Sequence, residues 1–372
     1  MNPTLQPTLT APALRHSPLV FAGSDPFAAD EVRRTLHARN DDAGLATHVR
    51  AALQPGERAV LSAAFRRGGP VVAHLVTPRT LRHAEPVAPR ARVHDVVAEP
   101  TAEGYRVLVA SALDRIASGD VAKVVLGRCL EVCSSPALSP GEITSALLTG
   151  RPGPYVFCLP LDDAPDAPWL VGASPELLVR RRGAEISSTP LAGSVPRSSD
   201  PDEDSRRASA LADSTKDLAE HAFVVRHIAE ALAPVCDRLE VPDRPEVIAT
   251  DSMWHLASPL RGRLAEPGEH TALDLGRLLH PTPAVGGVPT EAATGLIDRL
   301  EGPGLRGPFG GFVGWMDGRG DGELAVTIRA GVLAGERLRL FAGAGIVDGS
   351  DPRAEAEETA AKLGTMSRAV GL

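Results

Sequence analysis

The residues best suited to chemistry are carboxylates spaced one helical turn apart. Near the end of the chain, the stretch DPRAEAEETAAK places Glu355 and Glu358 at i and i+3, with Lys362 on the same face. Asp351 and Pro352 are typical of a helix N-terminus, where acids also stabilise the helix dipole. Because such acids can be explained by capping alone, a cation site needs a second group of ligands elsewhere.

A second pair of acids stands on another predicted helix. The stretch STKDLAEH places Asp217 and Glu220 at i and i+3, directly after a serine and a threonine that can cap the helix. Four carboxylates with no histidine or cysteine at ligand spacing favour oxygen ligation, which suits Mg²⁺ better than Zn²⁺. The two pairs together predict a magnesium site, although each helix alone could simply be well capped.

One lysine and one glutamate are candidates for proton transfer. Lys123 lies in the apolar stretch VAKVVLGR, either as an edge-strand lysine or as a desolvated base. Glu176 follows a Ser-Pro turn in VGASPELLV, either as a solvated strand end or as a partly buried acid that keeps its proton. A base and an acid in one site suit an addition–elimination in which water enters and hydroxide leaves.

Several features could bind an anionic substrate. Arg329 stands on the otherwise apolar strand LAVTIRAGV, and its guanidinium matches a carboxylate. The stretches FAGAGIV and PLAGS offer backbone that can approach a ligand closely. None of these features is specific alone, but together with a cation they could hold a carboxylate in an acidic protein.

Composition excludes several classes of partner. The 372 residues carry a net charge of −8 and only 3% aromatic residues, which argues against a nucleic-acid partner. No run of 18 apolar residues could span a membrane, and residues 1–15 lack the pattern of a signal peptide. We expect those residues to form a flexible tail. Four cysteines without a CxxC pair indicate reduced thiols in a cytoplasmic protein.

The elements that must position these residues are mostly strands. Helical spacing of apolar residues covers 102–120 and 214–235, and the first of these leads directly into the strand of Lys123. Residues 253–264 are predicted as one strand and 311–347 as three, with glycine-rich turns. The acidic stretch 198–213 is expected to be a solvated loop that enters a helix. Strands in hairpins with interspersed helices indicate an α+β fold.

These stretches, in this order, resemble the chorismate-utilising enzymes, which include isochorismate, salicylate, anthranilate and aminodeoxychorismate synthases. The resemblance spans residues 100–370 and implies a single large catalytic domain, expected over 16–372, of two packed antiparallel β-sheets surrounded by helices. The matching stretches are KVVLGR, GASPELL, STPLAGS, STKDLAEH, MWHLAS, LLHPTPAVGG, GPFGGFVGW, ELAVTIRAG, LFAGAGIV and AEAEETAAKL.

The resemblance implies chorismate as substrate and Mg²⁺ as cofactor. Lys123 would activate water for attack at C2, and Glu176 would protonate the departing C4 hydroxyl. The implied metal ligands, acting directly or through water, are Glu220, Glu358, Asp217 and Glu355. The implied substrate-binding residues are Gly193, Ser194, His255, Ala284, Phe309, Ile328, Arg329, Gly343, Gly345 and Lys362.

Within the family, Lys123 favours water over ammonia as the nucleophile. The segment HPTPA, together with Phe309 and Ile328, resembles members that release isochorismate. The expected activity is therefore isochorismate synthesis by a monomer, for siderophore or related secondary-metabolite biosynthesis. The alternatives are a salicylate synthase, which also eliminates pyruvate, and a catalytically inactive chorismate-binding protein. The presence of Lys123, Glu176 and both acid pairs counts against the inactive protein.

Overall fold

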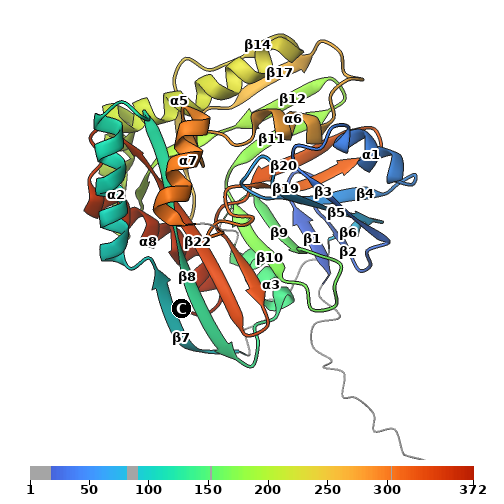
Figure 1. The fold of residues 1–372 in the computed structure, drawn as a ribbon, viewed down its shortest axis with the longest axis horizontal. Coiled ribbons are helices and arrows are strands. Elements are labelled where there is room, and N and C mark those ends of the chain that lie inside the picture. The colour runs from blue at the N-terminus through green and yellow to red at the C-terminus, as the bar shows by residue number, and fades with distance from the viewer. Residues whose placement is uncertain (1–17, 82–90, 151–152, 303) are drawn as a thin grey trace, which may run out of the picture.

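The strands of the chain form two large antiparallel sheets and one small sheet (Figure 1). The structure is a computed structural model that describes residues 18–81, 91–150, 153–302 and 304–372. The predicted tail, residues 1–15, lies outside the described residues. The predicted α+β architecture of packed antiparallel sheets with surrounding helices is confirmed.

The first sheet carries the longest strand of the described chain, and its strand pairs are antiparallel. In spatial order its strands are β18 (Gly287–Val288), β8 (Lys123–Ser135), β22 (Arg337–Val347), β21 (Ala330–Ala334), β10 (Trp169–Ser174), β9 (Tyr155–Pro160), β1 (Leu19–Ala22), β2 (Phe27–Ala29) and β6 (Arg79–Thr80), with β7 (Arg92–Glu99) pairing β8.

The second sheet is also antiparallel. Its order is β14 (Cys236–Glu240), β17 (Leu260–Leu264), β12 (Glu185–Thr189), β11 (Leu177–Arg182), β20 (Gly322–Val326), β19 (Phe312–Asp317), β4 (Arg58–Ala63), β5 (Pro70–Val76) and β3 (Arg34–Arg39). A small third sheet contains β13 (Leu191–Pro196), β16 (Met253–Ala257) and β15 (Glu246–Ala249).

The two large sheets pack face to face, and helices cover their outer faces. Phe21 and Phe157 of the first sheet pack with Val313 and Trp315 of the second in one buried cluster. In Figure 1, α3 and α8 lie against the first sheet, whereas α5 and α6 lie over the second. The helices are α1 (Leu45–Ala52), α2 (Ala102–Ala117), α3 (Pro140–Gly150), α4 (Pro201–Asp213), α5 (Thr215–Leu232), α6 (Ala272–Leu279), α7 (Thr290–Glu301) and α8 (Pro352–Ala369), with a short 3₁₀ turn at Ala233–Val235.

Two neighbouring chain segments cross from one large sheet to the other. One runs from β10 to β11, and the other from β20 to β21. The segments are antiparallel neighbours, because β10 pairs with β21 and β11 pairs with β20. Backbone hydrogen bonds join them at the crossing, where Ala173 N donates to Arg329 O at 3.0 Å and Val326 N donates to Glu176 O at 3.1 Å.

Three local predictions are wrong. The acidic stretch expected as a solvated loop is mostly helix α4, because Asp200 caps it by accepting from the backbone N–H groups of Asp202 and Glu203. The single strand predicted over 253–264 is two strands in different sheets. The segment 311–347 contains four strands, since the chain turns at the sheet crossing as well as at its glycines.

Two further observations concern the chain as a whole. Among the described residues, no helix is both long enough and apolar enough to cross a membrane. The four cysteines, at positions 129, 133, 158 and 236, are unpaired. The predicted absence of disulfides therefore holds at all four positions.

The close approach of β19 and β20 predicts a stability difference between two glycines. A Cβ atom on Gly314 would overlap the backbone carbonyl oxygen of Glu323. Gly314→Ala should therefore lower the free energy of unfolding by about 1–3 kcal/mol, because the strands must separate. Gly318→Ala is the matched control, since its Cβ would have no neighbour within 4 Å. Urea unfolding of both variants checks this, and equal midpoints would contradict it.

Candidate active site

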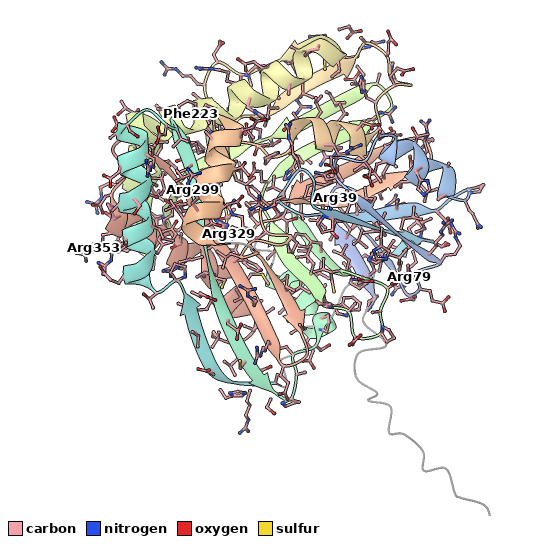
Figure 2. The ribbon with its side chains drawn as sticks, in the orientation of Figure 1. Arg39, Arg79, Phe223, Arg299, Arg329 and Arg353 are labelled. Atoms are coloured by element: carbon pink, nitrogen blue, oxygen red, sulfur yellow. The ribbon has the colours of Figure 1, made fainter. Side chains whose placement is uncertain are left out.

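An acid and an arginine lie on the sheet crossing. Glu176 stands between β10 and β11, and Arg329 stands between β20 and β21. Both are buried, and Figure 2 shows Arg329 near the middle of the molecule. Arg329 has φ = +50°, the only positive φ of a non-glycine residue in the described ranges. Strain of this kind is typical of positions that are held for function.

The environment of Glu176 keeps its carboxyl protonated. Burial raises the pKa of Glu176 to about 8, although the Leu191 N–H and the charges of Lys123, Lys362 and Arg329 act in the opposite direction. A carboxyl with this pKa holds its proton at neutral pH and can still release it. Glu176 therefore has the protonation state that a general acid requires.

Lys123 lies at the start of β8 rather than in the middle of a strand. It is fully buried between β18 and β22, where it pairs with Val288 and Val347, so it is not an edge-strand lysine. Its Nζ lies 3.0 Å from Glu220 Oε1, in an ion pair that lacks hydrogen-bond geometry. A Cβ on Gly345 would overlap that Glu220 oxygen, so only glycine fits beside the pair.

The acids of α8 face inward, as their spacing predicted. Glu358 accepts from Ser194 Oγ at 2.8 Å and pairs with Lys362 at 2.5 Å, whereas Glu355 pairs with Lys216 at 2.7 Å. Burial and the charge of Glu358 raise the pKa of Glu355 to about 7, against the effect of Lys216. Burial would raise the pKa of Glu358 too, but Lys362, Ser194 and Lys216 lower it below its ordinary value.

The first turn of α5 brings the second acid pair to the same place. Ser214 caps the helix, and its Oγ donates to Asp217 at 2.5 Å. Asp217 packs against Gly193, where φ = +76° and the tight approach of the Asp217 side chain both favour glycine. Burial raises the pKa of Asp217, while Ser214 lowers it.

His221 holds this end of α5 in place, and the sequence reasoning missed it. Its ring nitrogens lie 3.1 Å from Ala192 O and 2.8 Å from Ser258 Oγ. Burial lowers the pKa of His221 to about 4, so the ring is neutral and can serve both partners. The signal was its position directly after Glu220, on the buried face of the helix.

One cavity collects most of the predicted residues. Its lining includes Glu176, Gly193, Ser194, Glu220, His255, Ala284, Phe309, Ile328, Arg329, Gly343, Gly345, Glu358 and Lys362. The remaining three predicted residues do not line the cavity. Lys123 pairs with the lining residue Glu220, Asp217 packs against Gly193, and Glu355 interacts electrostatically with Glu358. The structure therefore brings together residues that are far apart in the sequence.

Apolar lining residues were missed by the sequence reasoning. Phe341 stacks on Phe309 with ring centroids 5.5 Å apart and an interplanar angle of 13°. Val125, Leu191 and Val285 complete this wall. Phe341 is two residues before Gly343 on β22, so strand alternation was the available signal. This apolar wall faces the charged groups across the cavity.

His255 offers a neutral polar group to the cavity. Burial, Arg329 and Lys362 lower its pKa well below the ordinary value. Its Nε2 is buried without a hydrogen-bond partner among the described residues. A polar atom in that state is usually satisfied by a ligand or by water, so His255 can contact a bound substrate.

The four carboxylates fit a hard cation. They are oxygen donors on the first two turns of two helices, and Glu355 Oε2 is buried without a partner in the described structure. They do not form a tight cage, because three of them are paired with lysines and Asp217 accepts from Ser214. Among the described residues, three side chains whose possible ligand atoms all lie within 4.8 Å of one another are found elsewhere, at the surface. These are His37, Asp162 and Asp163.

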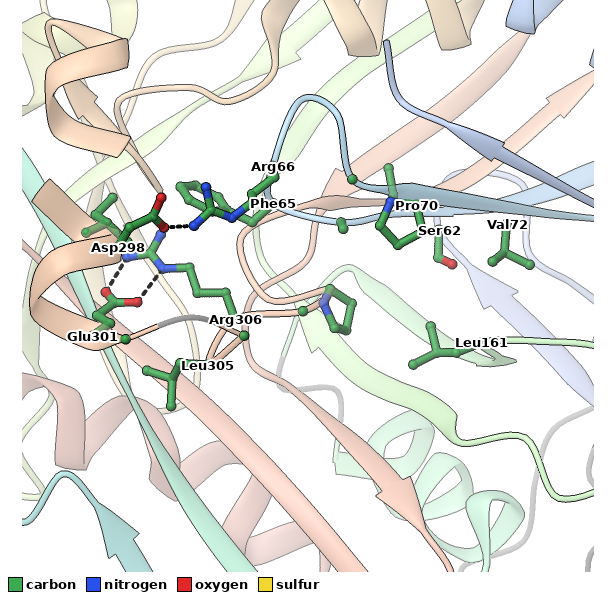
Figure 3. A pocket seen from close by; sticks show the side chains of 18 residues that line it. Ser62, Phe65, Arg66, Pro70, Val72, Leu161, Asp298, Glu301, Leu305 and Arg306 are labelled. Carbon is green, nitrogen blue, oxygen red and sulfur yellow. Dashed lines mark hydrogen bonds and ion pairs between the residues drawn. The ribbon is translucent and has the colours of Figure 1, made fainter. Parts of the chain in front are cut away.

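A larger cavity lies beside the active site and is mostly apolar. Its volume is about 280 Å³, and it opens between the β4–β5 turn and the end of α7 (Figure 3). Glu301 and Arg306 form a buried ion pair along its wall. This ion pair is hydrogen-bonded to the backbone of β8, which forms part of the active-site wall. Glu301 accepts from Gly127 N at 2.6 Å, and Arg306 donates to Val125 O at 2.6 Å.

Comparison with known proteins places this geometry in a family. The model of the family described as chorismate binding enzyme matches residues 73–371. The isochorismate synthase DhbC of Bacillus subtilis is 44% identical over 311 residues, 81% of this chain and 78% of that protein. The isochorismate synthase EntC of Escherichia coli K12 is 42% identical over 273 residues, covering 73% and 68% of the two chains.

A solved structure agrees over nearly the whole chain. The crystal structure of DhbC from Bacillus anthracis, assigned as a 2,3-dihydroxybenzoate-specific isochorismate synthase, superposes with a TM-score of 0.87 and 38% identity. It covers 95% of this chain and 96% of that one. The chain belongs to the chorismate-binding enzyme family, and the predicted resemblance is confirmed.

The raised pKa of Glu176 predicts a pH-dependent stability. The ordinary pKa of this carboxyl is 4.5. Between pH 4.5 and about pH 8, the folded protein therefore keeps a proton that the unfolded chain has lost. The stabilising contribution is therefore complete below about pH 4.5 and is lost as pH rises towards 8. Glu176→Gln should flatten this part of the stability curve, measured by thermal unfolding across the range. An identical slope in the variant would contradict the assignment.

Proposed function

We propose that this protein is an isochorismate synthase, which adds water at C2 of chorismate with loss of the C4 hydroxyl. The observation that carries the proposal is that a buried lysine and a protonated glutamate occur at the same cavity. Glu176 and Arg329 line the cavity, and the fully buried Lys123 lies directly behind the lining residues Glu220 and Gly345. The relatives named as isochorismate synthases support the same activity.

The proposed mechanism uses the two groups in opposite directions. Lys123 would take a proton from the water that attacks C2. Glu176 gives its proton to the C4 hydroxyl, which leaves as water while the ring double bond shifts. One hydroxyl enters and one leaves, so the reaction is an isomerisation. Burial of both groups excludes bulk water that would otherwise exchange these protons.

Chain residues would hold the substrate carboxylates and the metal. Arg329 and Lys362 line the cavity as cations, and Arg329 offers a planar fork to a carboxylate. Glu220 and Glu358 would hold Mg²⁺, with Asp217 and Glu355 steadying it directly or through water. When bound, Mg²⁺ supplies positive charge that neutralises these acids and binds a substrate carboxylate.

The setting of the reaction is also part of the proposal. The Bacillus anthracis protein is described as specific for 2,3-dihydroxybenzoate, which supports a role in siderophore or related secondary-metabolite biosynthesis. Four unpaired cysteines support a reducing compartment such as the cytoplasm. We propose a monomer, and the molecular mass in solution tests this directly.

Removal of the acid or the base should abolish turnover without loss of binding. Lys123→Ala and Glu176→Gln should each lower kcat by about 10²–10⁴-fold, because each removes one proton transfer. Chorismate binding, followed by calorimetry, should change much less. Gly318→Ala is the control, because Gly318 does not line the cavity and its added Cβ would have no neighbour within 4 Å. Unchanged kcat in Lys123→Ala would contradict the base assignment.

Product analysis tests the proposed reaction directly. Chorismate and Mg²⁺ should give a mixture of chorismate and isochorismate, and EDTA should stop the conversion. Pyruvate should be only a trace, since Phe309 and Ile328 present an apolar wall without a hydroxyl to hold the enolpyruvyl group against the ring. Phe309→Tyr with Ile328→Leu should raise that trace. Stoichiometric pyruvate from the unmodified enzyme would identify a salicylate synthase instead.

A further inference from the structure

The chain contains only three lysines, and all three contact carboxylates of the candidate metal site. Of its 39 basic lysine and arginine residues, lysine occurs only at positions 123, 216 and 362. Lys123 pairs with Glu220, Lys216 with Glu355 and Lys362 with Glu358. A compact ammonium occurs only where these acids meet, and arginine carries every other fixed positive side-chain charge.

Lys216 differs from the other two lysines. Lys123 is fully buried and is the proposed base, and Lys362 lines the substrate cavity. Lys216 lines no part of that cavity, and its side chain is 30% exposed. Its partner Glu355 is 1% exposed, so the ion pair joins a buried carboxylate to a lysine whose side chain is partly exposed.

The outer side of Lys216 leaves room for it to move. Lys216 lines a recess of about 700 Å³ that shares no lining residue with the substrate cavity. Asp348, an exposed carboxylate, lines the same recess, as does Phe223, which Figure 2 labels. A lysine side chain has four rotatable methylene groups, so its ammonium can leave Glu355 and remain hydrated or meet Asp348.

We propose that Lys216 is an exchangeable counter-ion for the metal site, which balances Glu355 in the ion-free enzyme and is displaced into the outer recess when Mg²⁺ binds. The inference rests on the proposed function, since it takes these carboxylates as the magnesium ligands. A buried carboxylate without a cation is costly, so Glu355 needs the Lys216 ammonium when no metal is bound. Once Mg²⁺ neutralises Glu355, the ammonium is no longer needed there and can leave. Lys216 is thus a positioning residue that competes with the metal.

Amine labelling of the unmodified protein tests the exchange. A trace of acetic anhydride, followed by mass spectrometry, reports each lysine separately because there are only three. Addition of Mg²⁺ should raise the labelling of Lys216 severalfold, whereas the buried Lys123 should stay protected. The N-terminal amine is the internal reference. If Mg²⁺ binds and Lys216 labelling stays constant, the exchange is wrong.

Metal affinity gives an independent measurement. Lys216→Met removes the competing charge at similar length, so calorimetry at mildly alkaline pH should show Mg²⁺ bound about tenfold more tightly. Lys216→Arg should restore the wild-type affinity. Arg353→Met is the matched control, because it removes the same charge from an exposed pair with Glu357 on α8.

The two measurements separate this inference from the proposed function. Equal Mg²⁺ affinity in wild type, Lys216→Met and Arg353→Met would overturn the exchange and leave the metal site standing. Absence of Mg²⁺ binding by wild type, with and without chorismate, would overturn the metal site and the exchange with it. Isochorismate formation that persists in EDTA would show that the enzyme is active without a bound metal, and would overturn both the metal site and the exchange.

Discussion

The crossing of two hydrogen-bonded chain segments between the large sheets is the constraint on which the site depends. Because the segments are joined by backbone hydrogen bonds on either side of the crossing, neither can shift without the other. Glu176 and Arg329 occupy this crossing, so an acid and a cation are fixed by main-chain geometry rather than by side-chain packing. The positive φ of Arg329 is the local cost of that arrangement.

Charge balance is the second requirement, since the site buries several carboxylates, and a buried charge is costly unless it is paired. Each inward acid has a partner: an ammonium for Glu220, Glu355 and Glu358, and a hydroxyl for Asp217. Burial raises the pKa of Glu176 to about 8, because it has no such close partner, and its carboxyl keeps its proton. Burial acts in the same direction on Glu358, but Lys362, Ser194 and Lys216 offset it and lower the pKa of Glu358 below its ordinary value.

The sequence predicted the helical acid pairs well, because i and i+3 spacing on a capped helix fixes a face regardless of context. It also predicted the antiparallel architecture. It failed where tertiary structure decides the outcome. The apolar stretch around Lys123 is compatible with an edge strand, whereas in the structure β18 pairs with β8 at this lysine. The sheet crossing also divides the predicted run of strands over 311–347, and the run over 253–264 is divided between the small sheet and the second sheet. The roles of Phe341, which stacks on Phe309, and of His221, which anchors α5, depend on packing between elements that are distant in the sequence.

The buried pair of Glu301 and Arg306 separates two cavities that share one wall. It is hydrogen-bonded to the backbone of β8 and of the segment before β18. These hydrogen bonds hold the backbone of the catalytic side in place without help from the other residues that line the apolar cavity. The N-terminal strands that line the apolar cavity begin before residue 73, where the family match starts. The shape of the apolar cavity can therefore change without moving the reacting groups, provided that this ion pair and its backbone hydrogen bonds stay in place.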